Sequence, residues 1–260
     1  MFNHEAERRL YQTNSFLSPN RSLSPDELSH LCESRLILIQ STPRVWKFLV
    51  ILDLFSLSYQ GDRSERIKAV LWLNCPNIKT LIMPFDNPGR WIPTPHAVFR
   101  LRKLDFPKKS AKLSGEQSTA LTLFFESQPE LIEVCLPLKC TLNLSASCLP
   151  DLKFLTGRAS FCFPLLSSGQ RPLESLMLLD EPVPRDKFVR KLATQPRLKV
   201  LSLPRGRLLP LFSSSLATLR RLNLMLVRSL PTCSGHIDIS CRHACILFSV
   251  SHSIQTKGRS

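Results

Sequence analysis

Few of the residues that could do chemistry in this chain stand in a recognisable pattern. His4-Glu5 begins the His-Glu-x-x-His arrangement of a zinc protease, but Arg8 occupies the place of the second metal ligand. The chain has no glycine-rich phosphate loop and no Gly-x-Ser-x-Gly turn that would expose a nucleophilic serine. Its aspartates and glutamates are scattered, without a recognisable pair. The sequence therefore predicts a protein that is not an enzyme and needs no cofactor.

Cysteine and histidine are concentrated in residues 231–260, where a zinc site could be assembled. The candidate ligands are Cys233, His236, Cys241, His243 and Cys245. Their spacing matches no established zinc knuckle, so no metal site is predicted. We interpret 231–260 as an atypical tail that need not be ordered. One further strand is an alternative, because Ile237 and Ile239 alternate with polar residues.

The chain is strongly basic, which points to acidic partners. Its 35 Lys and Arg against 20 Asp and Glu give a formal charge of +15, which suits nucleic acid, an anionic membrane surface or an acidic protein. No aromatic-interleaved basic motif is present, so nucleic acid is the disfavoured partner. Residues 1–10 lack a signal-peptide core, and the apolar run 48–57 is too short to cross a membrane. We therefore expect an intracellular protein, cytoplasmic or nuclear, with no membrane partner and mostly reduced cysteines.

A leucine motif returns seven times at intervals of 21 to 30 residues. Its copies begin at Ile78, Leu101, Leu131, Leu152, Leu173, Leu198 and Leu219. Six of them fit apolar-x-x-apolar-x-apolar, and the fourth fails at its last place, Gly157. A proline precedes five of the copies, where it would end one element and begin a strand. A period in the twenties with this pattern is typical of leucine-rich repeats, although abundant leucine could produce single copies by chance.

Amphipathic segments between the copies indicate helices over 64–74, 115–128 and 185–194. The predicted fold class is therefore α/β: an irregular leucine-rich-repeat solenoid, or horseshoe, with parallel strands on the concave face and helices on the convex face. The turns should vary, because the asparagine that usually satisfies backbone groups in such repeats is missing. We expect 1–35 to be loosely ordered apart from a short helix over 25–32 capped by Ser24, and 36–230 to form the repeat domain.

Two stretches resemble a known family: LIQSTPRVWKFLVILDL (Leu38–Leu54) and LWLNCPNIKTLIMP (Leu71–Pro84). They are similar to the irregular leucine-rich region of fungal F-box proteins, particularly those of mushroom-forming fungi. The resemblance implies an N-terminal F-box that docks on a Skp-type adaptor of a cullin ubiquitin ligase, and repeats that hold the substrate. LSPDEL (Leu23–Leu28) echoes the opening of an F-box, but the helical apolar pattern that should follow is absent. The chain instead reads as a first strand region from Val45, so the F-box itself is not recognisable, adaptor binding is in doubt, and no adaptor contacts are assigned.

Basic residues recur directly after the first apolar residue of each copy. This second place holds Lys79, Arg102, Ile132, Lys153, Glu174, Lys199 and Arg220, and Lys103 and Arg221 follow two of them. Strict alternation would turn this place toward the core, so its exposure requires that the chain has not yet joined the sheet there. We predict that Lys79, Arg102, Lys103, Lys153, Lys199, Arg220 and Arg221 form a basic ladder on the concave side that binds an acidic or phosphorylated protein segment. The alternative is that these side chains only solvate the strand edges.

The sequence thus favours a protein-binding repeat module that serves as the substrate-recognition part of an F-box-like ubiquitin ligase component. An interaction scaffold unrelated to ubiquitin is the first alternative. A basic nucleic-acid binder is the second, and it would show steeply salt-dependent binding.

Overall fold

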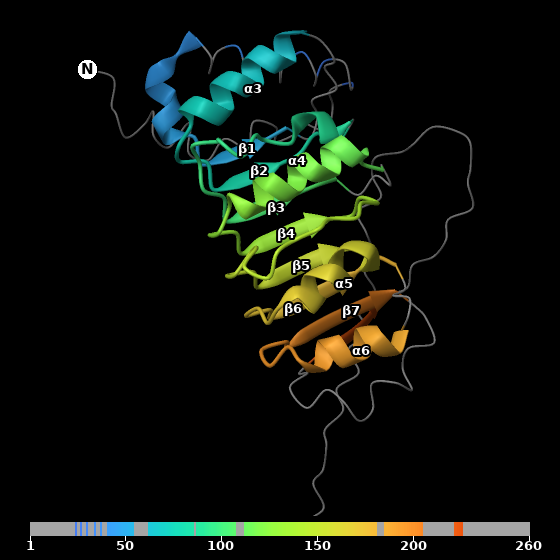
Figure 1. Cartoon of the computed structure of the whole chain (residues 1–260). Coiled ribbons are helices and arrows are strands. Elements are labelled where there is room, and N and C mark those ends of the chain that lie inside the picture. Colours follow the sequence, from blue (N-terminus) through green and yellow to red (C-terminus); the bar gives the residue numbers. More distant parts are fainter. Residues whose placement is uncertain are drawn as a thin grey trace, which may run out of the picture.

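The computed structural model describes residues 41–54, 62–85, 87–107, 112–180, 185–204 and 221–225, together with Ser24, Glu27, His30, Ser34 and Ile37. Its eight strands are β1 (Ile51–Asp53), β2 (Thr80–Ile82), β3 (Lys103–Asp105), β4 (Glu133–Leu136), β5 (Phe154–Gly157), β6 (Ser175–Leu178), β7 (Val200–Pro204) and β8 (Arg221–Met225). They form one open sheet in which each strand pairs in parallel with the next strand of the sequence (Figure 1).

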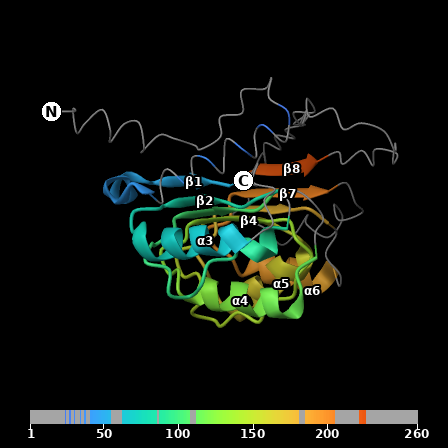
Figure 2. The same cartoon turned by 90° about the horizontal axis from the view of Figure 1, so that it is seen from above.

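The four α-helices of the described residues lie on one face of this sheet (Figure 2). They are α3 (Asp62–Asn74), α4 (Gly115–Glu126), α5 (Ala159–Ser168) and α6 (Arg185–Ala193), and two 3₁₀-helices are η1 (Pro43–Phe48) and η2 (Pro88–Trp91). Parallel neighbours require a crossover connection, and most of these helices lie in such crossovers. The predicted α/β class, with the parallel strands in one layer and the helices in another, is confirmed. The arrangement is compatible with a solenoid. The three helices predicted from amphipathicity correspond to α3, α4 and α6.

Every copy of the leucine motif gives one strand, which begins two residues after the first apolar residue. Leu131, Leu173 and Leu198, for example, precede β4, β6 and β7 by the same interval. An eighth copy at Leu49 precedes β1, although the sequence alignment did not include it. The expectation of a strand region from Val45 was wrong, because 43–48 form η1 and β1 begins at Ile51.

Three rows of apolar side chains from these copies form the core. The rows are Leu49, Ile78, Leu101, Leu131, Leu152, Leu173 and Leu198; Leu52, Leu81, Leu104, Val134, Leu155, Leu176 and Leu201; and Leu54, Met83, Phe106, Leu136, Leu178 and Leu203. Each of these side chains is at most 2% exposed. Burial of one such side chain contributes about 1.5–3 kcal/mol. A coil, meaning one strand with its crossover, supplies two or three such side chains, and its neighbours cover them. The coils are therefore stable only as a stack.

Gly157 interrupts the third row for a steric reason. A Cβ atom at this position would lie 3.1 Å from the carbonyl oxygen of Leu136, 3.1 Å from Cδ1 of Phe161 and 3.3 Å from Sγ of Cys162. The last two residues belong to α5, which begins directly after Arg158. The helix therefore fills the space that a leucine occupies in the other coils.

The crossovers are irregular, as the missing asparagine predicted. No helix lies in residues 137–153, between β4 and β5, and the β2–β3 crossover carries only η2. Two buried glutamines, each followed by proline, satisfy backbone groups instead. The side chain of Gln128 accepts a hydrogen bond from the N–H of Leu101 (2.8 Å) and donates to the carbonyl of Phe99 (3.3 Å). Gln195 accepts from the N–H of Arg171 (3.4 Å), but its Nε2 has no partner among the described residues.

Arg171 connects the helix-free stretch to α5. Its buried guanidinium donates to the carbonyl of Cys148 (2.8 and 3.2 Å), and also to the carbonyls of Leu165 and Gly169 at the end of α5. Burial lowers the pKa of Arg171, while a cation at a helix C-terminus is favoured by the helix dipole. The residue therefore satisfies carbonyls that would otherwise be buried without donors.

Ser24 caps a helical segment ahead of the repeats, as predicted. The N–H of Glu27 donates to the Ser24 hydroxyl (3.3 Å), and the N–H of Ser24 donates to the Glu27 carboxylate (2.7 Å). Helical positions continue to Ser34, Ile37 and Ser41, beyond the predicted end at residue 32. The remaining expectations for 1–35, and those for 231–260, fall on residues outside the described part of the chain.

Candidate functional site

In the copies from Ile78 to Leu198, the residues that follow the first apolar residue form one continuous row. We call Lys79, Arg102, Ile132, Lys153, Glu174 and Lys199 the start-edge row, because they lie where the strands begin. The N–H of each donates to the carbonyl of its counterpart in the preceding coil at 2.8–2.9 Å, starting from Val50. Successive members are therefore about 4.8 Å apart along the backbone.

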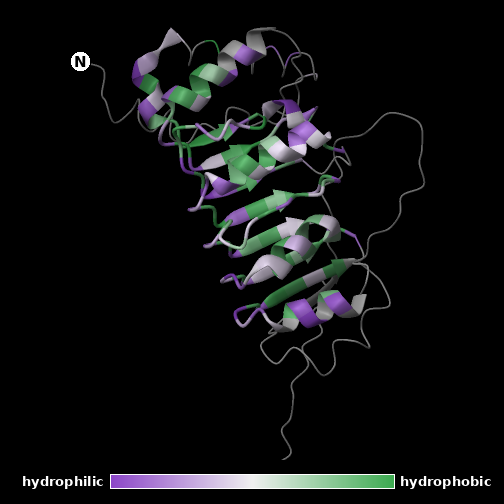
Figure 3. Cartoon of the chain, in the orientation of Figure 1, coloured by the Kyte–Doolittle hydropathy of each residue, from purple (hydrophilic) through white to green (hydrophobic). Residues whose placement is uncertain are grey.

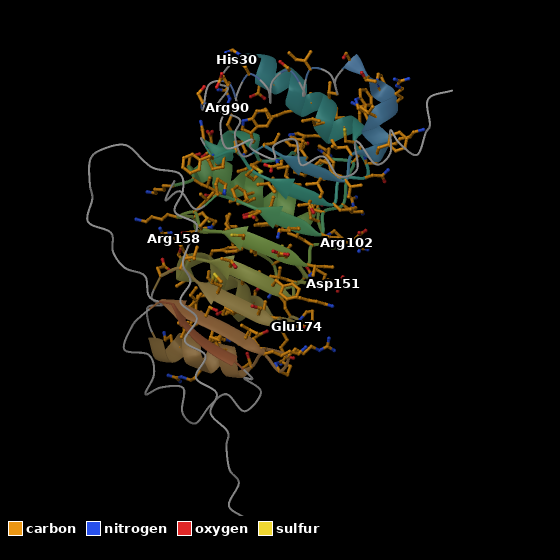
Figure 4. All side chains as sticks on the ribbon, turned by 180° about the vertical axis from the view of Figure 1, so that it is seen from behind. His30, Arg90, Arg102, Asp151, Arg158 and Glu174 are labelled. Atoms are coloured by element: carbon orange, nitrogen blue, oxygen red, sulfur yellow. The ribbon has the colours of Figure 1, made fainter. Side chains whose placement is uncertain are left out.

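None of these side chains is buried. Arg102 and Lys199 are exposed, and the other four are partly exposed. They escape the alternation of the sheet because the strand begins one residue later. Figure 4 shows Arg102, Asp151 and Glu174 along one edge of the sheet, and Figure 3 shows hydrophilic residues gathered where the strands begin.

Two of the predicted ladder residues cannot be placed in this row. Arg220 and the side chain of Arg221, the first residue of β8, lie outside the described part of the structure. Lys103 is the first residue of β3, directly beside Arg102.

Carboxylates pair with three cations of the predicted ladder. Lys79 lies 3.5 Å from Glu130, Lys103 lies 2.7 Å from Glu133, and Lys199 lies 2.7 Å from Glu174. The predicted row of like charges is thus partly neutralised within the protein, so it repels itself less than the sequence suggested.

The pKa shifts agree with this pairing. The hydrogen bond from Lys199, and then its charge, hold the pKa of Glu174 below its ordinary value, with smaller contributions from Lys153 and Arg197. Burial opposes the charge on Lys103, but the hydrogen bond and charge of Glu133, together with the charges of Asp105 and Cys135, outweigh burial and raise the pKa of Lys103.

Arg102 and Lys153 remain after these pairs are assigned. Neither forms an ion pair with a residue in the described part of the chain. Ile132 stands between them, since its N–H bonds to the Arg102 carbonyl and its own carbonyl accepts from Lys153, both at 2.9 Å. Asp151, in the turn before β5, is an exposed carboxylate that likewise has no cation partner among the described residues. The sequence showed these residues but not which of the charges were already paired.

The opposite edge of the sheet, where the strands end, carries polar groups that bond to one another. Figure 4 shows Arg90 and Arg158 at this edge. Arg158 donates to Asp180 (3.3 Å) and to the carbonyl of Pro137 (2.9 Å), and Asp180 accepts from the N–H of Ala159 (2.6 Å) at the start of α5. These contacts hold the crossovers in place, so this edge offers less unpaired charge to a partner.

The described thiols are suited to packing rather than to nucleophilic chemistry. Burial raises the pKa of Cys75 to about 12 and that of Cys140 and Cys148 to about 11. Cys162 is fully buried, as expected of a small apolar residue, whereas Cys135 is half-buried on the open face of β4. Within the described residues no group of three or more His, Cys, Asp or Glu could hold a metal ion. The candidate zinc ligands of the tail lie outside them.

No helix among the described residues is long and apolar enough to cross a membrane. The sequence matches no protein-family model and no curated protein. The resemblance to fungal F-box proteins therefore stays a prediction.

Proposed function

We propose that the chain is a leucine-rich-repeat protein that binds another protein through the start-edge row. The observation that carries this proposal is the repeated geometry: each leucine motif produces one parallel strand, in sequence order, and the copies from Ile78 to Leu198 present their second residue at the same edge. A stack of equivalent side chains about 4.8 Å apart is an extended surface of the kind that repeat proteins use for binding.

An acidic or phosphorylated segment is the partner that the charges favour. The chain carries a formal charge of +15. Neighbouring members of the start-edge row are about 4.8 Å apart, which is less than the Debye length of about 8 Å. Exposed ion pairs contribute only about 0.2–1 kcal/mol each. Cations that already have a carboxylate partner contribute less, because binding must first compete with that pair.

The finer proposal is that the repeats are the substrate-recognition part of an F-box-like component of a cullin ubiquitin ligase. Two features support it: the resemblance of 38–54 and 71–84 to fungal F-box proteins, and the helical conformation of the described residues Glu27, His30, Ser34, Ile37 and Ser41 ahead of the first coil. Co-purification with a Skp-type adaptor tests this part by itself. If the full chain binds acidic peptides but no adaptor, it is an interaction scaffold unrelated to ubiquitin.

Charge reversal tests the binding surface. The full chain carrying Lys153→Glu and Lys199→Glu should bind a fluorescent glutamate-rich peptide at least ten-fold more weakly than the wild type. The control is Lys187→Glu/Arg190→Glu, which changes the net charge by the same amount on two exposed side chains of α6, in the helix layer. Equal affinity of the row variant and the control would refute the assignment of this edge.

Salt dependence separates a protein ligand from nucleic acid. A peptide that makes two or three ion pairs should lose affinity gradually with salt. A single-stranded oligonucleotide that binds more tightly than any peptide, with a steep salt slope, would favour the nucleic-acid alternative.

A further inference from the structure

We infer that Arg102, Ile132, Lys153 and Phe154 form one site for a peptide segment in which an apolar side chain stands between two acidic ones. We call these four residues the basic–apolar cluster. The inference rests on the proposed function and goes further, because it names the residues that select the partner and the pattern that they recognise.

Charge is distributed unevenly along the edge where the strands begin. Lys79, Lys103 and Lys199 each have a carboxylate partner within 3.5 Å. Arg102 and Lys153 have no carboxylate partner in the part of the chain that the structure describes. An incoming acid at these two positions therefore breaks no ion pair of the described residues, and Lys153 interacts with Glu174 only through its charge.

An apolar surface lies between these two cations. Ile132 lies between Arg102 and Lys153 in the backbone ladder and is only partly buried. Phe154 follows Lys153, is 43% exposed, and donates its N–H to the Ile132 carbonyl at 3.0 Å.

Polar neighbours flank the Phe154 side chain, which stays 43% exposed. Phe154 stands in register with Glu133 on one side and Ser175 on the other. A large aromatic ring exposed on a sheet between polar residues gains from an apolar ligand group that covers it.

The separation of Arg102 and Lys153 matches the repeat of one extended peptide conformation. Arg102 and Lys153 belong to coils two strands apart, which is roughly 9.6 Å along the stack. In a polyproline II segment, residues i and i+3 share a face and lie about 9.3 Å apart. In a β-strand, residues on one face are about 6.6 Å or 13 Å apart. A Glu-x-x-Glu segment with an apolar residue inside it therefore fits the cluster best.

Carboxylates around the cluster favour a peptide over nucleic acid. Glu133, Glu174 and Asp151 lie among the cations of the same edge. A phosphate backbone carries charge at every nucleotide and would be forced against these carboxylates. A peptide can carry its two acids only where the cations lie.

Peptide binding to the full chain tests the inference. The reference probe is a terminally blocked peptide with the core Glu-Pro-Leu-Glu, and its comparators carry Gln-Pro-Leu-Gln or Glu-Pro-Ser-Glu. Arg102→Gln and Lys153→Gln should each weaken the reference peptide about three- to five-fold and leave the Gln peptide unchanged. Phe154→Ser should weaken the reference peptide about ten-fold and leave the Ser comparator unchanged.

Two controls separate the cluster from general effects of charge and hydrophobicity. Lys187→Gln removes a cation from α6, and Leu123→Ser removes a side chain that is 46% exposed on α4. Both should bind the reference peptide like the wild type. If Leu123→Ser weakens binding as much as Phe154→Ser does, the cluster is not the site.

Asp151→Asn supplies a test by gain of affinity. Removing this exposed carboxylate lowers the repulsion felt by the acidic peptide, so affinity should rise about two- to three-fold. Unchanged or weaker binding would contradict the placement of the peptide along this edge.

The outcomes distinguish this inference from the proposed function. If glutamate-rich peptides bind through Lys153 and Lys199 with no dependence on Phe154 or on the peptide leucine, the inference fails and the proposed function stands. If no acidic peptide binds the wild type, both fail. Displacement of the reference peptide by an oligonucleotide at lower concentration than by free peptide would overturn the assignment to a peptide.

Discussion

Replacing Gly157 by leucine completes the repeat pattern and should nevertheless destabilise the protein. Judged from the pattern alone, one more buried leucine would contribute about 1.5–3 kcal/mol of stability. The structure predicts the opposite sign, because the Cβ position is already within 3.1–3.3 Å of Leu136, Phe161 and Cys162.

The magnitude follows from two opposing effects. Forcing extra methylenes into a filled core costs about 1–3 kcal/mol. Replacing glycine restricts the unfolded chain and returns about 0.4–1 kcal/mol. We expect Gly157→Leu to lower the free energy of unfolding by about 1–2 kcal/mol, which is a fall of several degrees in Tm. Gly157→Ala should be close to neutral, because its single carbon requires shifts of only a few tenths of an ångström.

Urea denaturation followed by circular dichroism measures this difference, with Gly115→Ala as the matched glycine control. Nothing lies within 4 Å of a Cβ at Gly115, the first residue of α4, so that variant should be more stable than the wild type. Phe161→Ala should make room, so the double variant Gly157→Leu/Phe161→Ala should lose less stability than the two single losses combined. An increase in stability for Gly157→Leu alone would refute the packing argument.

The remaining predictions concern buried polar groups and thiols. Gln128→Leu should lower the free energy of unfolding by about 1–3 kcal/mol, because a buried backbone N–H loses its acceptor. Gln195→Leu should lower it clearly less in the same denaturation assay, since Nε2 of Gln195 has no partner among the described residues. Equal losses for the two variants would argue against this difference. Arg171→Met should cost about 2–4 kcal/mol by removing the donor to the carbonyls of Cys148, Leu165 and Gly169. A loss below 1 kcal/mol would show that those carbonyls find other donors. Iodoacetamide labelling of the native protein at pH 8, followed by mass spectrometry, should modify the half-buried Cys135 well before Cys75. The reason is that burial raises the pKa of Cys75 to about 12. The reverse order would contradict the described burial.

The strands could be predicted because their signal is local. Each motif contains its own proline or turn, its entry leucine and its alternating core residues, so β2 to β8 follow from spacing alone. The copy at Leu49 was missed because the chain from Val45 was interpreted as one strand region, whereas a proline at Pro43 begins η1 there.

Helix α5 could not be predicted because the residues that stabilise its ends are distant in sequence. Its interior contains Pro164, which argues against a helix. Its first N–H bonds to Asp180 of the next coil, and its last carbonyls bond to the buried Arg171. Neither contact has a signal in the local pattern.

The edge row was predictable in position but not in charge balance. The recurrence of a residue after each entry leucine fixes which side chains stack. Whether a lysine there is available depends on carboxylates such as Glu130 and Glu133, which lie one or two strands further along the sheet. The sequence therefore identified the row, and only the contacts separate Arg102 and Lys153 from the paired lysines.

Photo-crosslinking tests most directly the claim that the partner binds at this edge. A photo-reactive benzoylphenylalanine replaces Phe154 in one sample and Leu123, on α4 in the helix layer, in another. The Glu-Pro-Leu-Glu peptide should be labelled from position 154 and not from position 123, and excess unlabelled peptide should suppress the label. Labelling from position 123 alone would contradict the claim.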